Sequence, residues 1–130
     1  MAAEPITSLP QRAATVCSPS TNPAPRLVVR VHYPMLSRGG QQRVAVRVLD
    51  CTGRGVPGLS CTLIVHEAQG KRGLTTPPTD AQGYTEIAFP VNASPPGYRV
   101  LIEALALWQG YELRGQTSYI ICGLRNPSSP

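Results

Sequence analysis

The sequence predicts an all-β protein, built as a sandwich of two antiparallel sheets with about seven strands. Short stretches of the chain alternate apolar and polar residues with a period of two, which is the pattern of a half-buried strand. Turn-forming residues separate these stretches at intervals of roughly 10 to 18 residues. The chain supplies such turns with 14 prolines and 12 glycines. No stretch shows the periodicity of an amphipathic helix.

The clearest expected strands are the first two, over residues 26–33 and 43–48. Their inward positions are apolar: Leu27, Val29, Val31, Tyr33, Val44, Val46 and Val48. Later strands are expected at residues 61–65, 74–76, 85–91, 97–108 and 111–122. The strand at 97–108 is apolar on both faces, with Leu101, Leu105 and Leu107 on the outer one, which predicts a central strand or one that meets a partner. Strands of this number and spacing predict an immunoglobulin-like topology.

The chain is expected to hold one domain between two tails. At 130 residues it is about one domain long. Residues 1–25 are proline-rich and predict an extended linker, residues 26–122 form the sandwich, and residues 123–130 form a C-terminal tail. No apolar run approaches the ~18 residues of a membrane span, and no segment resembles a secretory leader. A secreted form would therefore have lost its leader.

The positive charge of the chain comes from arginine. The formal net charge is +5, and of 12 basic residues all but Lys71 are arginines. These arginines are scattered along the sequence and form no dense basic stripe with interleaved aromatic residues. The pattern therefore predicts no nucleic-acid partner.

Two of the arginines, Arg30 and Arg47, are expected on the outer face of the first two strands. If those strands form a hairpin with matched inward faces, Arg30 falls roughly opposite Arg47. Like charges opposed across strands are unfavourable, so an acidic neighbour is expected, and Glu86 is the plainest candidate. The basic face is then either a local ion-pair cluster or a binding site for an acidic ligand.

Four cysteines, Cys17, Cys51, Cys61 and Cys122, match neither a zinc site nor a thioredoxin-like motif. An even count in a small, turn-rich chain favours two disulfides and an oxidising compartment, with free thiols in a cytosolic protein as the alternative. In an immunoglobulin-like topology Cys51 and Cys61 fall at one end of the domain, which predicts a bridge between them. About nine extended residues after Cys17 reach ~30 Å, which lets Cys17 meet Cys122 at the other end.

The sequence carries no catalytic signature, so a non-enzymatic protein is predicted. His32 and His66 occupy outward strand positions without metal-ligand spacing, and no nucleophile elbow or phosphate-binding loop occurs. Asp80 and Glu67 are a possible carboxylate pair, but an aspartate in a turn is normally engaged by its own backbone. Neither a metal nor another cofactor is expected.

Aromatic residues offer one further candidate site. Trp108, Tyr111 and Tyr98 would form a sugar-stacking platform if they were exposed together. A single tryptophan near the end of a core strand also fits a core position.

An ordered set of turn motifs resembles the bacterial immunoglobulin-like modules of the invasin and intimin type. Those modules run as V-x-V-x-D, a G-x-P-x-x-G loop, an apolar strand, a T-D-x-x-G turn and P-G-Y-x-V-x-V. The matching residues here are Val46, Val48, Asp50, Gly55, Pro57, Gly58, Leu63, Val65, Thr79, Asp80, Gly83, Pro96, Gly97, Tyr98, Val100 and Ile102. Carboxypeptidase-regulatory and transthyretin-like sandwiches share similar turns. The resemblance implies a rigid spacer or adhesive unit on a bacterial surface.

Two functions of different classes are therefore expected. The first is a non-enzymatic extracellular structural or assembly module of a surface or filament protein, whose tails connect it to neighbouring modules. The second is an adhesion or carbohydrate-binding module that uses Trp108 and Tyr111 or the face of Arg30 and Arg47. The expected partners are proteins, including copies of the chain itself, or a glycan.

Overall fold

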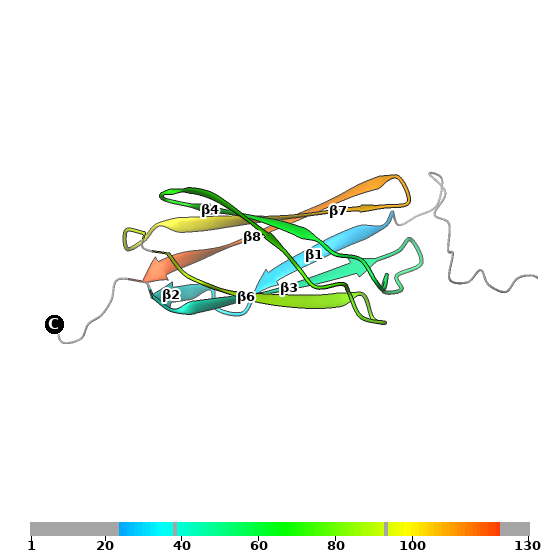
Figure 1. Ribbon diagram of the computed structural model, residues 1–130, viewed down its shortest axis with the longest axis horizontal. Coiled ribbons are helices and arrows are strands. Elements are labelled where there is room, and N and C mark those ends of the chain that lie inside the picture. Colours follow the sequence, from blue (N-terminus) through cyan, green and yellow to red (C-terminus); the bar gives the residue numbers. More distant parts are fainter. Residues whose placement is uncertain (1–23, 38, 93, 123–130) are drawn as a thin grey trace, which may run out of the picture.

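The computed structural model describes residues 24–37, 39–92 and 94–122 and shows a two-layered all-β chain (Figure 1). The strands are β1 (Arg26–Val31), β2 (Met35–Ser37), β3 (Gln41–Leu49), β4 (Thr62–Glu67), β5 (Gly70–Thr75), β6 (Tyr84–Pro90), β7 (Arg99–Trp108) and β8 (Tyr111–Cys122). These ranges hold no helix that could cross a membrane. The predicted tails, 1–25 and 123–130, lie outside the described residues apart from residues 24 and 25.

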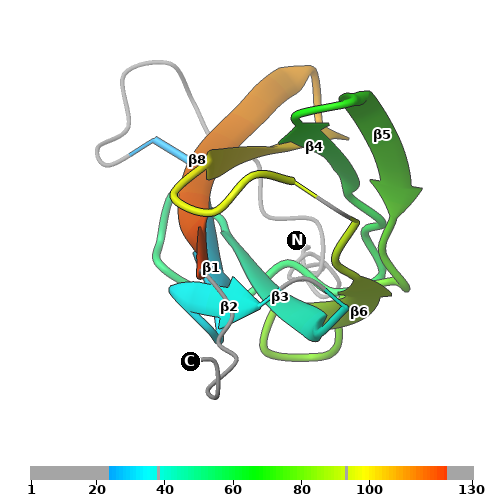
Figure 2. The same cartoon turned by 90° about the vertical axis from the view of Figure 1, so that its left-hand side faces the viewer.

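The strands form a three-stranded sheet of order β1-β3-β6 and a five-stranded sheet of order β2-β8-β7-β4-β5. Figure 2, which views the molecule end-on, shows the sheets on opposite sides of a shared interior. The predicted all-β class with two sheets is thus confirmed. All pairings are antiparallel except that of β2 with β8, which is parallel. The sequence predicted neither this pairing nor a separate strand at β2.

The extra strand arises because the chain changes sheet after β1. The buried side chain of Gln42 accepts a hydrogen bond from the Tyr33 N–H (3.1 Å) and donates one to the Tyr33 carbonyl (2.8 Å). The carbonyl of Pro34 then accepts a hydrogen bond from the N–H of Ile120 in β8 (2.9 Å). The first strand therefore ends at Val31, and Tyr33, which was predicted to face inward, is exposed.

The core lies between the sheets and follows the predicted alternation. Val44, Val46 and Val48 of β3 have no exposed surface. The fully buried side chains of the five-stranded sheet include Leu63, Val65, Val100 and Ile102. Burial of each such side chain stabilises the fold by about 1.5–3 kcal/mol relative to exposure. The two inner faces therefore hold the sheets together through one continuous cluster.

The register of β1 against β3 corrects the predicted arginine pair. Arg30 lies opposite Ala45, and Arg47 lies opposite Val28. The two arginines are therefore offset by two residues instead of facing each other. The inward valines set this register because a slip of one residue would turn them toward solvent.

The predicted disulfides are also corrected. Cys61 and Cys122 are free thiols, so neither the Cys51–Cys61 nor the Cys17–Cys122 bridge is present. The segment after β3 first turns back along that strand, through a backbone bridge at Gly55, before it crosses to the other sheet. Cys51 therefore lies in the turn after β3, while Cys61 packs in the core just before β4. Cys17 lies outside the described residues.

Candidate functional site

The described acidic residues all have ion-pair or hydrogen-bond partners, but several described arginines take part in no ion pair. The ion pairs are Glu67–Arg72, Glu86 with Arg43 and His32, Glu103–His66 and Glu112–Arg114. The Asp50 and Asp80 carboxylates accept backbone hydrogen bonds. In the described ranges, six basic residues take part in no ion pair, and two of them, Lys71 and Arg99, belong to the five-stranded sheet. The other four, termed here the arginine cluster, are Arg26, Arg30, Arg47 and Arg54.

Three members of the arginine cluster lie on the outer face of the three-stranded sheet. Arg47 of β3 pairs with Val28, which lies between Arg26 and Arg30 on β1. Arg47 is therefore a diagonal neighbour of both, at a separation of about 7–8 Å. All three side chains are exposed, and the Arg47 Nε donates a hydrogen bond to the Gln82 carbonyl (3.2 Å). Positive charges gathered in this way attract anions.

Two cavities adjoin the arginine cluster and share Arg47. The end cavity, of about 640 Å³, is lined by residues of the loop after β3, by Ala81 and Gln82, and by Trp108. The face cavity, of about 400 Å³, lies on the outer face of the three-stranded sheet and includes Arg30 and Tyr84. Because Arg47 lines both, the two cavities form one basic surface around the end of the sheet.

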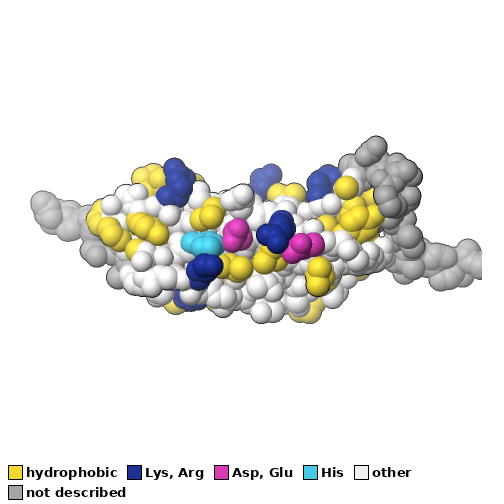
Figure 3. Space-filling view, turned by 90° about the horizontal axis from the view of Figure 1, so that it is seen from above, with side chains coloured by type: hydrophobic (Ala, Val, Ile, Leu, Met, Phe, Trp, Pro, Cys, Tyr) yellow, Lys and Arg dark blue, Asp and Glu magenta, His cyan; other side chains and the backbone are white. Residues whose placement is uncertain are grey.

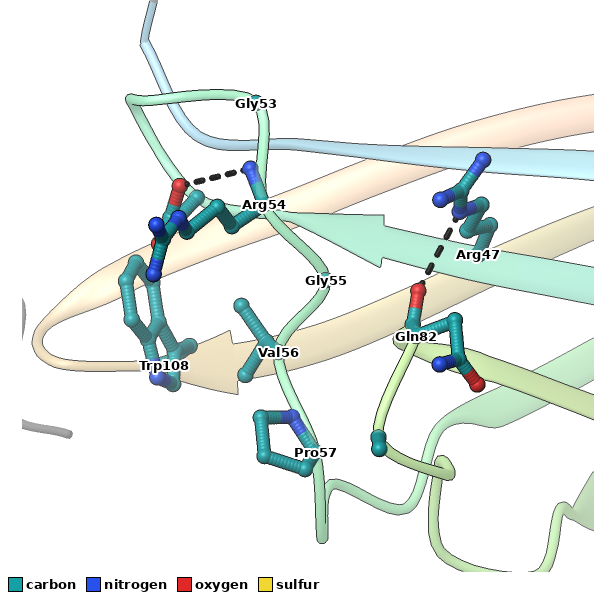
Figure 4. A pocket seen from close by; sticks show the side chains of 10 residues that line it. Arg47, Gly53, Arg54, Gly55, Val56, Pro57, Gln82 and Trp108 are labelled. Atoms are coloured by element: carbon teal, nitrogen blue, oxygen red, sulfur yellow. Dashed lines mark hydrogen bonds between the residues drawn. The ribbon is translucent and has the colours of Figure 1, made fainter.

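The end cavity combines two arginines with apolar walls, and it is also lined by Asp50, whose carboxylate interacts electrostatically with Arg54. Figure 4 shows the guanidinium end of Arg54 beside the ring of Trp108, with Val56 and Pro57 along the neighbouring wall. Arg47 lies on the other side, with its guanidinium hydrogen-bonded to the Gln82 backbone. This arrangement suits a ligand that has both a ring face and an anionic group.

Asp50 shapes the turn that carries Arg54. Its Oδ1 accepts hydrogen bonds from the Thr52 N–H (2.8 Å), the Thr52 hydroxyl (2.6 Å) and the Arg54 N–H (3.0 Å). Burial opposes ionisation of this carboxyl, but the hydrogen bonds from Thr52 and Arg54 outweigh it and lower the pKa of Asp50. Asp50 thus acts as a structural carboxylate and holds Arg54 at the rim of the end cavity.

The turn at Asp80 repeats the same geometry. In both turns the aspartate N–H donates to the carbonyl four residues later, and the N–H of the glycine three residues after the aspartate donates to the aspartate carbonyl. The Asp80 Oδ1 also accepts from the N–H groups of Gln82 (2.9 Å) and Tyr84 (3.0 Å). Two D-x-x-G turns therefore frame the end cavity, one before Arg54 and one before Tyr84.

The two turns interlock through Thr79 and two glycines. The Thr79 hydroxyl donates to the Val56 carbonyl (2.5 Å) and accepts from the Leu59 N–H (2.9 Å). A Cβ on Gly55 would lie 2.0 Å from the carbonyl carbon of Gln82, so the backbones touch at this point. The floor of the end cavity is therefore rigid backbone.

The predicted aromatic platform is brought together only in part, because Trp108 and Tyr111 are neighbours and Tyr98 is remote. Trp108 lines the end cavity, and Tyr111 is its strand partner across the β7–β8 hairpin but does not line that cavity. Tyr98 precedes the opposite end of β7, and ten strand residues at about 3.3 Å each separate it from Trp108. Trp108 also packs partly against the core, which is the alternative position that the sequence allowed.

The histidines and the proposed carboxylate pair have structural partners. His32 and His66 each contact one glutamate carboxylate, at 2.7 and 2.8 Å. Asp80 binds the backbone of its own turn, whereas Glu67 pairs with Arg72 at 2.6 Å. The described residues contain no group of three His, Cys, Asp or Glu side chains that is arranged to hold a metal.

Sequence reasoning identified Arg30, Arg47 and Trp108 but missed Arg26, Arg54 and Tyr84. Arg26 shares the outward alternation of β1, which was a usable signal. Arg54 lies in an irregular turn, whose direction alternation does not determine. Glu86 does neutralise part of this face, as predicted, but through Arg43 (3.0 Å) and not through the two predicted arginines.

Comparison with known proteins identifies the fold alone. No protein-family model and no curated protein matches the chain. A DUF4785 family protein from Legionella pneumophila is similar in structure, with a TM-score of 0.50 and 8% identity, over 72% of this chain and 27% of that one. The sporulation control protein Spo0M from Bacillus subtilis has a TM-score of 0.45 and 11% identity, over 80% of this chain and 51% of that one. The chain thus spans about a quarter and about half of these proteins.

Proposed function

We propose that the protein is a non-enzymatic immunoglobulin-like binding module at the bacterial cell surface that holds an acidic ligand through the arginine cluster. The observation that carries this proposal is a cluster of four arginines without ion pairs, three of which, Arg30, Arg47 and Arg54, line two adjoining cavities. Arginine suits the task because its planar guanidinium binds carboxylate, sulfate or phosphate groups with two parallel hydrogen bonds.

The strand order supports the immunoglobulin-like assignment. If β1, β3 and β6 correspond to strands A, B and E, then β8, β7, β4 and β5 correspond to G, F, C and C′. The resemblance to invasin and intimin modules supports the surface location, and its G-x-P loop and T-D-x-x-G turn interlock through Thr79. The thiols of Cys61 and Cys122 lend no support to an oxidising compartment.

An assembly module is the second candidate, because one outer face carries exposed apolar side chains. Leu107 is 73% exposed, and Leu101 and Leu105 are half-buried on the same face of β7. Figure 3, which views the five-stranded sheet from outside, shows hydrophobic side chains in separate groups with charged side chains between them. The ion pair of His66 and Glu103 lies within this face. A broken apolar surface favours ligand binding over self-assembly. Light scattering at high concentration tests the second candidate, which predicts a species larger than the monomer.

Retention on a heparin column tests the binding function. A variant with Arg26, Arg30 and Arg47 all changed to Ser should elute at much lower salt than the parent chain. The matched control changes Lys71, Arg99 and Arg114, on the five-stranded sheet, to Ser and removes the same formal charge. This control should elute close to the parent. Equal losses in both variants would show that net charge alone drives retention and would overturn the proposed function.

A further inference from the structure

We infer that the ligand is an acidic polysaccharide, with one sugar ring in the end cavity against Trp108 and its acidic group on Arg54 or Arg47. The inference rests on the proposed function and adds the ligand class and its position. The ligand class is inferred because arginine side chains and apolar side chains line both cavities.

The end cavity supplies the first ring position. Trp108 is half-buried and offers a ring surface, and Val56 and Pro57 give the neighbouring apolar wall. Arg54 extends beside that ring, so a bound sugar would meet the cation in the same place. A pyranose that bears a carboxylate or sulfate presents both an apolar ring face and an anion. A neutral sugar would leave the arginines unused.

The face cavity extends the same chemistry along the sheet. Its floor is apolar, with Val28, Ala45 and Leu49, and its rim carries Arg30 and Arg47. Because Arg47 also lines the end cavity, a chain of sugars that passed from one cavity to the other would remain next to an arginine side chain throughout. Two adjoining positions of this kind fit a polymer better than a single small anion.

Nucleic acid fits this surface less well. Its sequence-independent binding proteins combine a basic groove with several aromatic side chains on which successive bases stack. Among the aromatic residues that the structure describes, only Trp108 and Tyr84 line the two cavities, and the Tyr84 hydroxyl donates a hydrogen bond to the Glu86 carboxylate (2.7 Å).

Intrinsic fluorescence provides a direct readout, because Trp108 is the single tryptophan of the chain. The full chain is titrated with five probes: an oligogalacturonate, a heparin oligosaccharide, a neutral galactan oligosaccharide, oligoglutamate and single-stranded DNA. The inference expects a saturable fluorescence change with the acidic oligosaccharides, and the stronger of the two distinguishes carboxylate from sulfate preference. The neutral sugar and the ring-free oligoglutamate should leave the fluorescence unchanged.

Variants then locate the site. Arg54→Gln should raise the Kd for the preferred acidic oligosaccharide about tenfold, since a hydrogen bond to a charged group contributes about that much. The control Arg99→Gln removes an exposed arginine from the other sheet and should leave the Kd unchanged. Unfolding curves of both variants should match the parent, because neither position belongs to the core.

Three results would overturn the inference. Oligoglutamate binding as tightly as the acidic oligosaccharides would show that charge alone is recognised, and the proposed function would survive without the sugar. Single-stranded DNA binding more tightly than either oligosaccharide would replace the ligand class. Kd values equal to the parent's for both Arg54→Gln and Arg47→Gln would place the sugar outside the end cavity.

Discussion

Gly55 and Gly83 meet backbone to backbone where the two D-x-x-G turns interlock. A Cβ on Gly83 would lie 2.8 Å from the Gly55 Cα and 2.3 Å from the Val48 carbonyl oxygen. The Gly83 carbonyl accepts a hydrogen bond from the Val48 N–H (2.8 Å), and the Val56 N–H donates to the Val48 carbonyl (2.9 Å). These contacts tie the floor of the end cavity to β3, so any side chain at either glycine would push the turns apart.

Gly55→Ala should therefore destabilise the fold strongly. The new methyl group would collide with the Gln82 backbone, which no rotamer change relieves, and overpacking of this kind costs about 1–3 kcal/mol or more. Gly73→Ala is the matched control, because its Cβ meets nothing within 4 Å and its φ lies outside the left-handed region. The control should be neutral or stabilising by up to about 1 kcal/mol. Urea midpoints measure both, and equal midpoints would contradict the close contact.

The strands that could be predicted from the sequence are those in which buried and exposed residues alternate along the strand itself. Val44, Val46 and Val48 alternate along one strand, and their burial follows from that pattern without knowledge of any other strand. The pairing of β2 with β8 involves only three residues of each strand, and the paired residues lie 85 positions apart in the sequence. No local pattern encodes a contact over that separation. The predicted bridge between Cys51 and Cys61 failed for a related reason. The topology places both at one end, but the loop path decides where each side chain lies.

In the candidate site, too, the residues on strands could be predicted from the sequence, whereas the residue in a loop could not. Arg30 and Arg47 lie on strands, and alternation was enough to place both on the outer face. Their relative register was predicted wrongly because the connection contains β2, which was not expected. Arg54 reaches Trp108 only because the loop after β3 folds against the end of β7, a contact between segments far apart in the sequence. Such tertiary contacts are not determined by turn chemistry.

Asp50→Ala should lower the free energy of unfolding more than Asp80→Ala does in the second D-x-x-G turn. Asp50 is 5% exposed, and its carboxylate accepts three hydrogen bonds. A hydrogen bond to a charged group contributes about 1.5–3 kcal/mol, so a loss in that range is expected. Asp80→Ala is the matched control and should cost less, because its turn is exposed to water. Chemical unfolding compares the two, and a larger loss at Asp80 would contradict the assigned roles.

Tyr119→Phe should leave the fold as stable or make it more stable. The Tyr119 hydroxyl is buried and has no hydrogen-bond partner among the described residues. Burial, together with the nearby Glu67 carboxylate, raises the pKa of Tyr119 to about 12. Removal of an unsatisfied buried group removes its desolvation cost. Tyr84→Phe is the control, because that hydroxyl has a partner in Glu86 and its loss should not stabilise. A loss above about 1 kcal/mol at position 119 would show that the hydroxyl is satisfied.

The thiols of the described residues should react in a fixed order. Cys122 is half-buried, whereas Cys61 is fully buried in the core. Burial raises the pKa of the Cys61 thiol, an effect that the Thr76 side chain partly opposes, so its reactive thiolate is scarce. Alkylation of the native protein should therefore label Cys122 first and Cys61 only after unfolding, as read by mass spectrometry of the peptides.

The same peptide map tests the disulfide arrangement. With Cys61 and Cys122 as thiols, the only intrachain bridge that four cysteines still allow joins Cys17 to Cys51. A peptide that links Cys51 to Cys61 would contradict the structure and restore the bridge that the sequence predicted. Reductant should lower the unfolding midpoint if a peptide that links Cys17 to Cys51 is recovered, because loss of that bridge would remove its stabilisation of the folded state.

Acid should weaken the fold through Glu86. The hydrogen bond from the Tyr84 hydroxyl lowers the pKa of Glu86 below its usual 4.5, burial opposes this, and Arg43 and His32 lower it further. A carboxyl whose pKa is lower in the folded state stabilises the fold above its unfolded pKa, and this contribution is lost as the pH falls through the folded pKa. Below about pH 4.5 the urea midpoint of the parent should therefore fall more steeply than that of Glu86→Gln. Tyr84→Phe keeps the carboxyl but loses its main partner, so its slope should lie between the two. Parallel slopes in all three proteins would show that Glu86 is not linked to folding.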